Sequence, residues 1–150
     1  MYIEKDYLAS SLEEFENALK GYTLPLWDSL PDIELYMDQV ISLITKYMEI
    51  YGTVTGQMRV ITPSMINNYV KLGIIPAPVK KKYSKIHLSY LLIICTLKQT
   101  LDISTIQRII PVDLSEDEVM HTYNSFVLNQ RKAFSYVTDS IKSVAEPIIN

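Results

Sequence analysis

The segment from Lys85 to Thr100 constrains the fold more than any other part of the chain. Apolar side chains occupy most sides of this segment, so a helix formed here must be surrounded by other elements. Ser84 stands directly before it, where a hydroxyl can cap the first turn. The most apolar run, residues 90–97, is far shorter than the ~20 residues of a membrane-spanning helix. We therefore expect a buried central helix and no membrane partner.

The rest of the chain predicts further helices and shows no alternating pattern typical of strands. Helix-start and helix-stop residues place helices at residues 10–20, 33–51, 62–72, 104–111 and 115–147. Their expected caps are Ser10 or Ser11, Asp32, Thr62, Ser104 and Ser115. Two prolines and Trp27 predict an ordered connector over residues 24–32, and residues 52–56 are expected to form a loop. The expected fold class is all-α.

Charge is distributed unevenly, although the net charge of the whole chain is only −3. Residues 57–110 hold eight basic residues and one acidic residue, whereas the remainder holds six basic and sixteen acidic residues. The basic residues of the middle segment are Arg59, Lys71, Lys80, Lys81, Lys82, Lys85, Lys98 and Arg108. A basic middle between acidic arms is typical of a module that binds a polyanion. Chance clustering on a solvated surface is the alternative.

The helix predicted over residues 62–72 has one continuous polar side. Thr62 and Pro63 form a strong helix start, and Gly73 ends it. The polar stripe contains no carboxylate and consists of Ser64, Asn67, Asn68 and Lys71. The residues left to face a core are Met65, Ile66, Tyr69 and Leu72. Asparagine is a mediocre helix former, so two in mid-helix indicate a task such as binding adenine in the major groove. A merely solvated face is the alternative.

Residues 80–85 follow this helix after a turn stiffened by Pro76 and Pro78. They include four lysines and one tyrosine, which suit contacts to the phosphates and sugars of DNA. The candidate DNA-contacting residues are Arg59, Thr62, Ser64, Asn67, Asn68, Lys71, Lys80, Lys81, Lys82, Tyr83 and Lys85.

Residues 61–78 resemble the MerR-type pattern of a recognition helix followed by a Gly–apolar–apolar–Pro turn. Tyr83 and Ser84 are similar to the start of the helix that follows the wing in that family, and Ile103 and Ser104 stand where its next helix begins. Together with residues 24–40, the chain resembles a bacterial family known only as a domain of unknown function and regarded as related to MerR-type domains. The resemblance implies a winged helix-turn-helix over residues 24–111.

The chain departs from the MerR pattern at the residues that would contact DNA. MerR proteins usually carry an arginine and two aromatic residues where Asn67, Asn68 and Tyr69 stand here. Val79, Lys80 and Lys81 replace the usual glycine, tyrosine and arginine of the wing. We therefore expect a shorter wing.

The last predicted helix is amphipathic over most of its length. Ser115 and Glu118 form a capping box at its start. The heptad-like stripe consists of Val119, Tyr123, Phe126, Gln130, Ala133, Val137, Ser140 and Val144. Because this stripe is longer than a small domain needs, we expect a homodimer through residues 115–146, with a helix folded over its own core as the alternative. Residues 1–23 are expected to form an N-terminal helix and residues 112–150 a C-terminal region.

These observations favour a cytoplasmic DNA-binding transcriptional regulator whose helix 62–72 reads double-stranded DNA and whose lysine-rich segment 80–85 holds the backbone. The alternative, which the overall acidity favours, is a protein-interaction module on a helix-turn-helix scaffold that does not bind DNA.

Catalytic motifs are missing from the sequence. His87 and Cys95 lie about 12 Å apart along one predicted helix, too far for joint chemistry. We expect no enzyme activity, cofactor, metal or small-molecule ligand.

Overall fold

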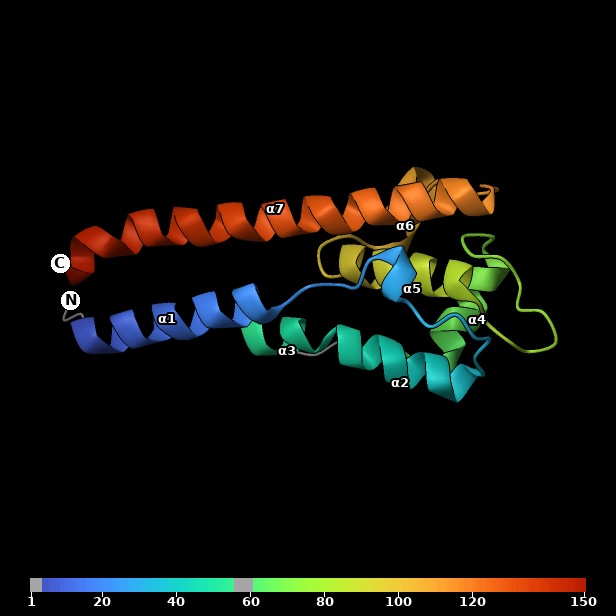
Figure 1. The fold of residues 1–150 in the computed structure, drawn as a ribbon, viewed down its shortest axis with the longest axis horizontal. Coiled ribbons are helices and arrows are strands. Elements are labelled where there is room, and N and C mark those ends of the chain that lie inside the picture. The colour runs from blue at the N-terminus through green and yellow to red at the C-terminus, as the bar shows by residue number, and fades with distance from the viewer. Residues whose placement is uncertain (1–3, 56–60) are drawn as a thin grey trace.

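The computed structural model describes residues 4–55 and 61–150, and within these residues the chain forms seven α-helices, one 3-10 turn and no strand (Figure 1). The elements are α1 (Lys5–Gly21), η1 (Trp27–Ser29), α2 (Met37–Tyr47), α3 (Glu49–Thr55), α4 (Pro63–Lys71), α5 (Lys85–Leu97), α6 (Ile103–Ile109) and α7 (Glu116–Ile149). The expected all-α class is therefore confirmed. In the part of the chain so described, no helix combines the length and apolarity needed to cross a bilayer.

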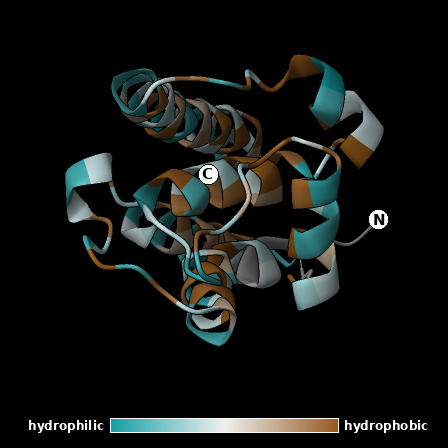
Figure 2. Ribbon diagram, turned by 90° about the vertical axis from the view of Figure 1, so that its right-hand side faces the viewer, coloured by the Kyte–Doolittle hydropathy of each residue, from teal (hydrophilic) through white to brown (hydrophobic). Residues whose placement is uncertain are grey.

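Helix α5 lies at the centre of the body, as the sequence predicts. Its residues 87–95 are all buried, so every side of the helix meets another element. Helices α2 and α7 pack against it, and Figure 2, which views the molecule from one end, shows helices on several sides of the middle. The first half of α7 belongs to the same core, because Val119, Tyr123 and Val127 are buried there.

The predicted helix 33–51 is replaced by an extended segment and two shorter helices. Leu35 exchanges both of its backbone hydrogen bonds with Tyr83, at N–O distances of 2.9 and 2.8 Å. This pairing holds the chain extended, so α2 begins only after Tyr36, and Asp32 is not a cap. Gln39 instead accepts a hydrogen bond from the Tyr36 backbone N–H. The chain bends at Met48, and α3 then continues through Gly52, where a loop was expected.

Other helix ends differ from the prediction for local reasons. Helix α1 begins at Lys5, so Ser10 and Ser11 lie inside it. Asp102, not Ser104, caps α6, since its Oδ1 accepts from both the Thr105 backbone N–H and the Ser104 hydroxyl at 2.8 Å. Pro147 does not end α7, which runs unbroken over 34 residues to Ile149. The predicted start at Ser115 and Glu118 is confirmed.

Helix α7 fixes the connector between α1 and α2 through its backbone. The Tyr123 hydroxyl and the Arg131 guanidinium donate to the carbonyl oxygens of Pro25 and Leu24. The Asn124 side chain accepts from the Trp27 backbone N–H at 2.9 Å. Because these groups are spread over two turns of α7, the connector cannot slide along the helix without losing several hydrogen bonds at once.

An aromatic cluster joins α1, α3 and α7 beyond the connector. The rings of Tyr22, Tyr51 and Phe134 lie 5.4 to 6.3 Å apart in edge-on or tilted arrangements. Gln130 donates a hydrogen bond to the Tyr51 hydroxyl at 2.8 Å. Beyond this cluster, α1 and the second half of α7 run side by side away from the body (Figure 1).

His87 connects the start of α5 to the preceding turn. The Ser84 backbone N–H donates to its Nδ1 at 2.9 Å, so the proton of the neutral ring stands on Nε2, which donates to the Ala77 carbonyl at 3.3 Å. The ring is buried and packs edge-on against Tyr83. Burial lowers the pKa of His87 below its ordinary value.

We expect the stability of the fold to fall as the pH drops from 7 to 5.5. The unfolded chain binds a proton at His87 more readily than the folded chain, so stability is present above the unfolded pKa of ~6.5 and is lost below it. His87→Gln keeps an acceptor for the Ser84 N–H without titrating, and it should flatten this dependence in urea titrations. His121→Gln, at an exposed histidine, is the control. An unchanged dependence in His87→Gln would contradict the assignment.

Candidate nucleic-acid interface

Helix α4 is defined at both ends by capping chemistry that the sequence displays. The Thr62 hydroxyl accepts from the Met65 backbone N–H at 3.2 Å, and Pro63 occupies the first turn. At the other end, Gly73 adopts φ +74°, and its N–H donates to the Val70 carbonyl at 3.0 Å. The Ile74 N–H donates to the Tyr69 carbonyl at the same distance, which completes a Schellman motif.

The exposed side of α4 is the predicted polar stripe. Ser64, Asn67, Asn68 and Lys71 are all exposed. Ile66 and Tyr69 are buried on the other side, with exposed fractions of 0% and 1%. Burial raises the pKa of the Tyr69 hydroxyl to about 12, and that hydroxyl accepts a hydrogen bond from Lys98 at 3.2 Å. Leu72 is an exception to the prediction, because it is 36% exposed at the helix end. The four polar side chains are therefore available to an external partner.

Residues 79–82 form a tight two-residue turn at the tip of the loop between α4 and α5. Val79 and Lys82 exchange backbone hydrogen bonds at 3.1 and 3.0 Å. Lys80 and Lys81 occupy the two corners with φ of 51° and 64°. Two positive φ values are the mark of a type I′ hairpin turn, in which Asn-Gly is the preferred pair. Lysine is an unusual choice there, since the left-handed conformation costs a residue with a Cβ roughly 1–2 kcal/mol.

A groove separates this turn from the starts of α2 and α4. Its volume is about 500 Å³, and its lining residues are Tyr36, Met37, Asp38, Ile41, Pro63 and Lys81. The lining joins residues from the cap and first turns of α2, the first residue of α4 and the tip of the turn, so these three parts of the chain adjoin one another. The Lys82 ammonium lies 5.7 Å from the centroid of the Tyr36 ring, which contributes to holding the turn in place.

Tyr36 is a candidate contact residue that the sequence analysis missed. Its side chain is 53% exposed beside the groove. No local signal marked it, because the extended conformation that turns Tyr36 away from the buried Leu35 depends on the distant pairing of Leu35 with Tyr83. Asp38, also exposed on the groove, is an acidic neighbour that the sequence analysis did not connect with the lysines.

Two residues of the predicted set are placed differently, and a third lies outside the described residues. Tyr83 is 3% exposed and packs against His87, so its ring belongs to the core and not to a DNA-contacting surface. The Lys85 ammonium lies 5.5 Å from the centroid of the Trp27 ring, and this half-buried residue lines a separate pocket with Asp32, Glu34 and Glu116. Arg59 lies outside the described residues.

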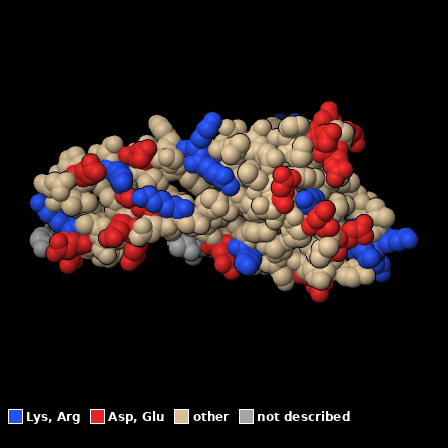
Figure 3. All heavy atoms as spheres, viewed as in Figure 1, with Lys and Arg blue, Asp and Glu red and all other residues tan. Residues whose placement is uncertain are grey.

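The remaining lysines of the set lie on α4 and on the turn at residues 79–82. Lys71, Lys80 and Lys81 are exposed, and Lys82 is half-buried under its contact with Tyr36. Figure 3 shows a basic group at the tip where Figure 1 places the loop between α4 and α5, with acidic side chains near the start of α7. The basic middle of the sequence is therefore not one continuous patch, because Lys85 and Lys98 lie against aromatic rings elsewhere.

An apolar cavity of about 180 Å³ lies between α5, α6 and the start of α7. Its lining is almost entirely hydrocarbon, with Tyr90 and Thr122 as the polar exceptions. The Tyr90 hydroxyl donates to the Pro111 carbonyl at 3.0 Å. Cys95 is buried, and burial raises the pKa of its thiol to about 12. In residues 4–55 and 61–150, no group of three or more His, Cys, Asp and Glu side chains is arranged to hold a metal ion.

Comparison with known proteins places the chain in a family without assigning an activity. No curated protein and no solved structure matches it. The model of one family, described as a domain of unknown function, matches residues 25–130. This range contains the groove, the exposed side of α4 and the turn at residues 79–82, and it ends within α7. Because the match covers more than half of the chain, the protein belongs to the DUF1836 family.

Proposed function

We propose that this protein binds double-stranded DNA as a transcriptional regulator with a MerR-like winged helix-turn-helix. The observation that carries the proposal is the exposed side of α4, which holds amides, a hydroxyl and a lysine but no carboxylate. This side stands on a helix whose start adjoins a turn with two lysines at its tip.

In this proposal α4 enters the major groove, which is wide enough to admit an α-helix. Asn67 and Asn68 lie in mid-helix, where an amide can donate to and accept from the edge of adenine. Ser64 lies one turn before them and Lys71 one turn after, within reach of the backbone on either side of the groove. Because the opposite side of α4 is held in the core by Ile66 and Tyr69, the helix presents its polar side rigidly.

The turn at residues 79–82 acts as a short wing that contacts phosphates. Lys80 and Lys81 are exposed at its two corners. Their left-handed backbone lowers stability, and strain of this kind is commonly retained where the side chains serve a function. Hydrogen bonds from His87 to Ala77 and between Leu35 and Tyr83 fix the segment on both sides of the turn. The backbone that carries Lys80 and Lys81 therefore has a defined position relative to α4.

A protein-interaction module is the second candidate function. The groove favours it, because Tyr36, Met37 and Ile41 give the lining an apolar part and Asp38 would repel a phosphate. Such a module would bind a partner protein in the groove and would show no salt-dependent affinity for DNA.

Replacing Asn67 or Asn68 with alanine tests whether these residues recognise the DNA sequence without contributing to the free energy of unfolding. Each alanine variant should keep or slightly raise the free energy of unfolding, because alanine is the better helix former and both positions are exposed. For the asparagine that makes a bidentate contact, affinity for a DNA site selected by the wild-type protein should fall by ~1–3 kcal/mol. Affinity for unrelated DNA should hardly change, as measured by fluorescence anisotropy.

Asn129→Ala is the matched control, since Asn129 is an exposed helical asparagine on α7. It should leave both affinities unchanged. If Asn67→Ala and Asn68→Ala bind the selected site as the wild-type protein does, α4 is not the reader. The interaction module then becomes the better explanation of the exposed stripe.

Replacing Lys80 and Lys81 with the residues preferred in a type I′ turn should stabilise the fold and weaken DNA binding. The variant Lys80→Asn with Lys81→Gly relieves the left-handed strain, so its free energy of unfolding should rise by about 1 kcal/mol. If both lysines contact phosphates, the slope of log K against log salt should flatten by about 1.8, from ~0.9 per contact.

The control variant removes the same charge elsewhere. Lys20→Gln with Lys132→Gln changes two exposed lysines on α1 and α7. It should leave the salt slope as it is in the wild-type protein. A turn variant that is more stable but has an unchanged slope would show that Lys80 and Lys81 do not contact phosphate.

A further inference from the structure

A pocket of about 280 Å³ lies between the end of α1, the residues that follow it and the second half of α7. Figure 3 shows the surface hollowed where these helices meet near the body, with basic side chains at the edge. Leu19, Tyr22 and Phe134 give the pocket an apolar part, and the rings of Tyr22 and Phe134 lie edge-on at 5.4 Å. The pocket therefore offers apolar surface beside cationic groups.

Arg131, which lines this pocket, carries a charge that the chain leaves unbalanced. Its guanidinium donates to the Leu24 carbonyl at 3.2 Å, but its Nε is buried and has no hydrogen-bond partner among the described residues. A guanidinium has five N–H donors, so most of its capacity is unused. In the described parts of the chain, no carboxylate lies within salt-bridge distance of Arg131. A half-buried cation in this position favours the approach of an anion.

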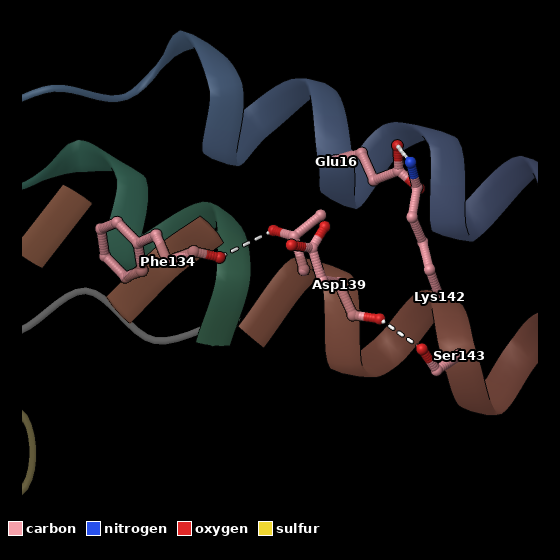
Figure 4. A network of polar contacts seen from close by, with 6 residues as sticks. Glu16, Phe134, Asp139, Lys142 and Ser143 are labelled. Atoms are coloured by element: carbon pink, nitrogen blue, oxygen red, sulfur yellow. Dashed lines mark hydrogen bonds and ion pairs between the residues drawn. The ribbon is translucent and has the colours of Figure 1, made fainter. Parts of the chain in front are cut away.

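The other charged residues of the lining largely balance one another. Lys142 reaches across to Glu16 on α1, at an N–O distance of 3.2 Å (Figure 4). Lys20 and Asp139 carry opposite charges and both line the pocket. Once these four residues are set against each other, one positive charge remains, on Arg131. A single positive charge suits a ligand with a single negative charge.

Two hydroxyl groups of the lining are available to the same ligand. Ser135 lies one turn after Arg131 on α7, and Thr23 directly precedes the residue whose carbonyl accepts from Arg131. Both Ser135 and Thr23 are exposed and line the pocket. The Thr138 hydroxyl is already used, because it donates to the Phe134 carbonyl at 2.9 Å (Figure 4).

We infer that this pocket binds a small organic acid, with its carboxylate against Arg131 and its apolar body against Leu19, Tyr22 and Phe134. A carboxylate accepts paired hydrogen bonds from a guanidinium, and these charge-assisted bonds are strong. Because a cavity of about 150 Å³ holds one benzene molecule, 280 Å³ leaves room for a ring that carries a carboxylate. Helical spacing could not reveal this pocket, since its lining comes from both ends of the chain. The inference does not rest on DNA binding.

NMR titration of the full chain with benzoate tests the inference. Backbone amide signals of residues 19–23 and 131–139 should shift and saturate, with a dissociation constant of ~1 mM for a ligand of so few atoms. Benzyl alcohol has the same ring without the charge, so it should bind at least ~10-fold more weakly. Inorganic phosphate has no apolar body and should also bind more weakly than benzoate.

The variant Ser135→Asp places a carboxylate one turn from Arg131, where it competes with the ligand for the same donors. It should raise the dissociation constant for benzoate more than ~10-fold. Ser140→Asp is the matched control, because Ser140 is exposed on the same helix and lies outside the pocket lining. It should leave the affinity for benzoate unchanged. Since both serines are exposed, both variants should keep the wild-type helical content in circular dichroism.

Arg131→Gln removes the charge and should also raise the dissociation constant for benzoate more than ~10-fold. If this variant unfolds, because its contact with the Leu24 carbonyl is lost, Ser135→Asp still decides the question. The inference is overturned if ~20 mM benzoate shifts no signals of the pocket, if benzyl alcohol binds as tightly as benzoate, or if folded Ser135→Asp binds benzoate as the wild-type protein does. Phosphate that binds more tightly than benzoate would overturn the assignment of an organic acid.

Discussion

The complete burial of α5 is the constraint on which the rest of the structure depends. Nine consecutive residues, 87–95, lie inside the protein, so no side of this helix is left for solvent. An isolated helix of this composition could not stay in solution, and its surroundings must supply apolar surface all around. Helices α2 and α7 do so along its length. The start of α5 also carries the hydrogen bonds of Ser84 and His87, which fix the preceding turn. The turn of the candidate interface is therefore held in place by the buried helix α5.

Helix α7 extends this rigidity from the body to the part of the molecule where it runs beside α1. Its first half is part of the core through Val119 and Tyr123, and its second half lies along α1. At a rise of about 1.5 Å per residue, its 34 residues span about 51 Å without a break. The connector that leads into α2 is held by side chains from the middle of this helix. One continuous element thus joins α1 to the body that carries α4.

Where the sequence analysis succeeded, the signals were local. Thr62 with Pro63, Gly73, and Ser115 with Glu118 act within one turn of a helix, and the structure places the helix ends there. The polar stripe of α4 followed in the same way from helical spacing, and the match to a domain-of-unknown-function family confirms that part of the resemblance.

The failures came from contacts between distant segments. Asp32 lost its expected role because Leu35 pairs with Tyr83, 48 positions later in the sequence. The same pairing buries Tyr83, and Trp27 draws Lys85 to another part of the surface. Composition at residues 80–85 could not reveal either contact.

The net charge of −3 does not oppose the binding of a polyanion at the tip of this molecule. Interactions between exposed charges are largely screened beyond the Debye length, which is about 8 Å at physiological salt. The acidic helix α1 lies beside the second half of α7 at one end of the molecule, and the loop with the lysine turn projects at the opposite end (Figure 1). Local charges around α4 and the turn therefore decide whether a phosphate can approach.

Among the residues that line the groove there, Asp38 is the acidic one, and Lys81 is the basic one at the tip. Asp38 lies in the first turn of α2, where a carboxylate is favoured by the helix dipole, and this gives its presence a cause separate from any partner. The balance between Asp38 and the lysines of the turn is thus a local electrostatic property that the overall acidity of the chain does not determine.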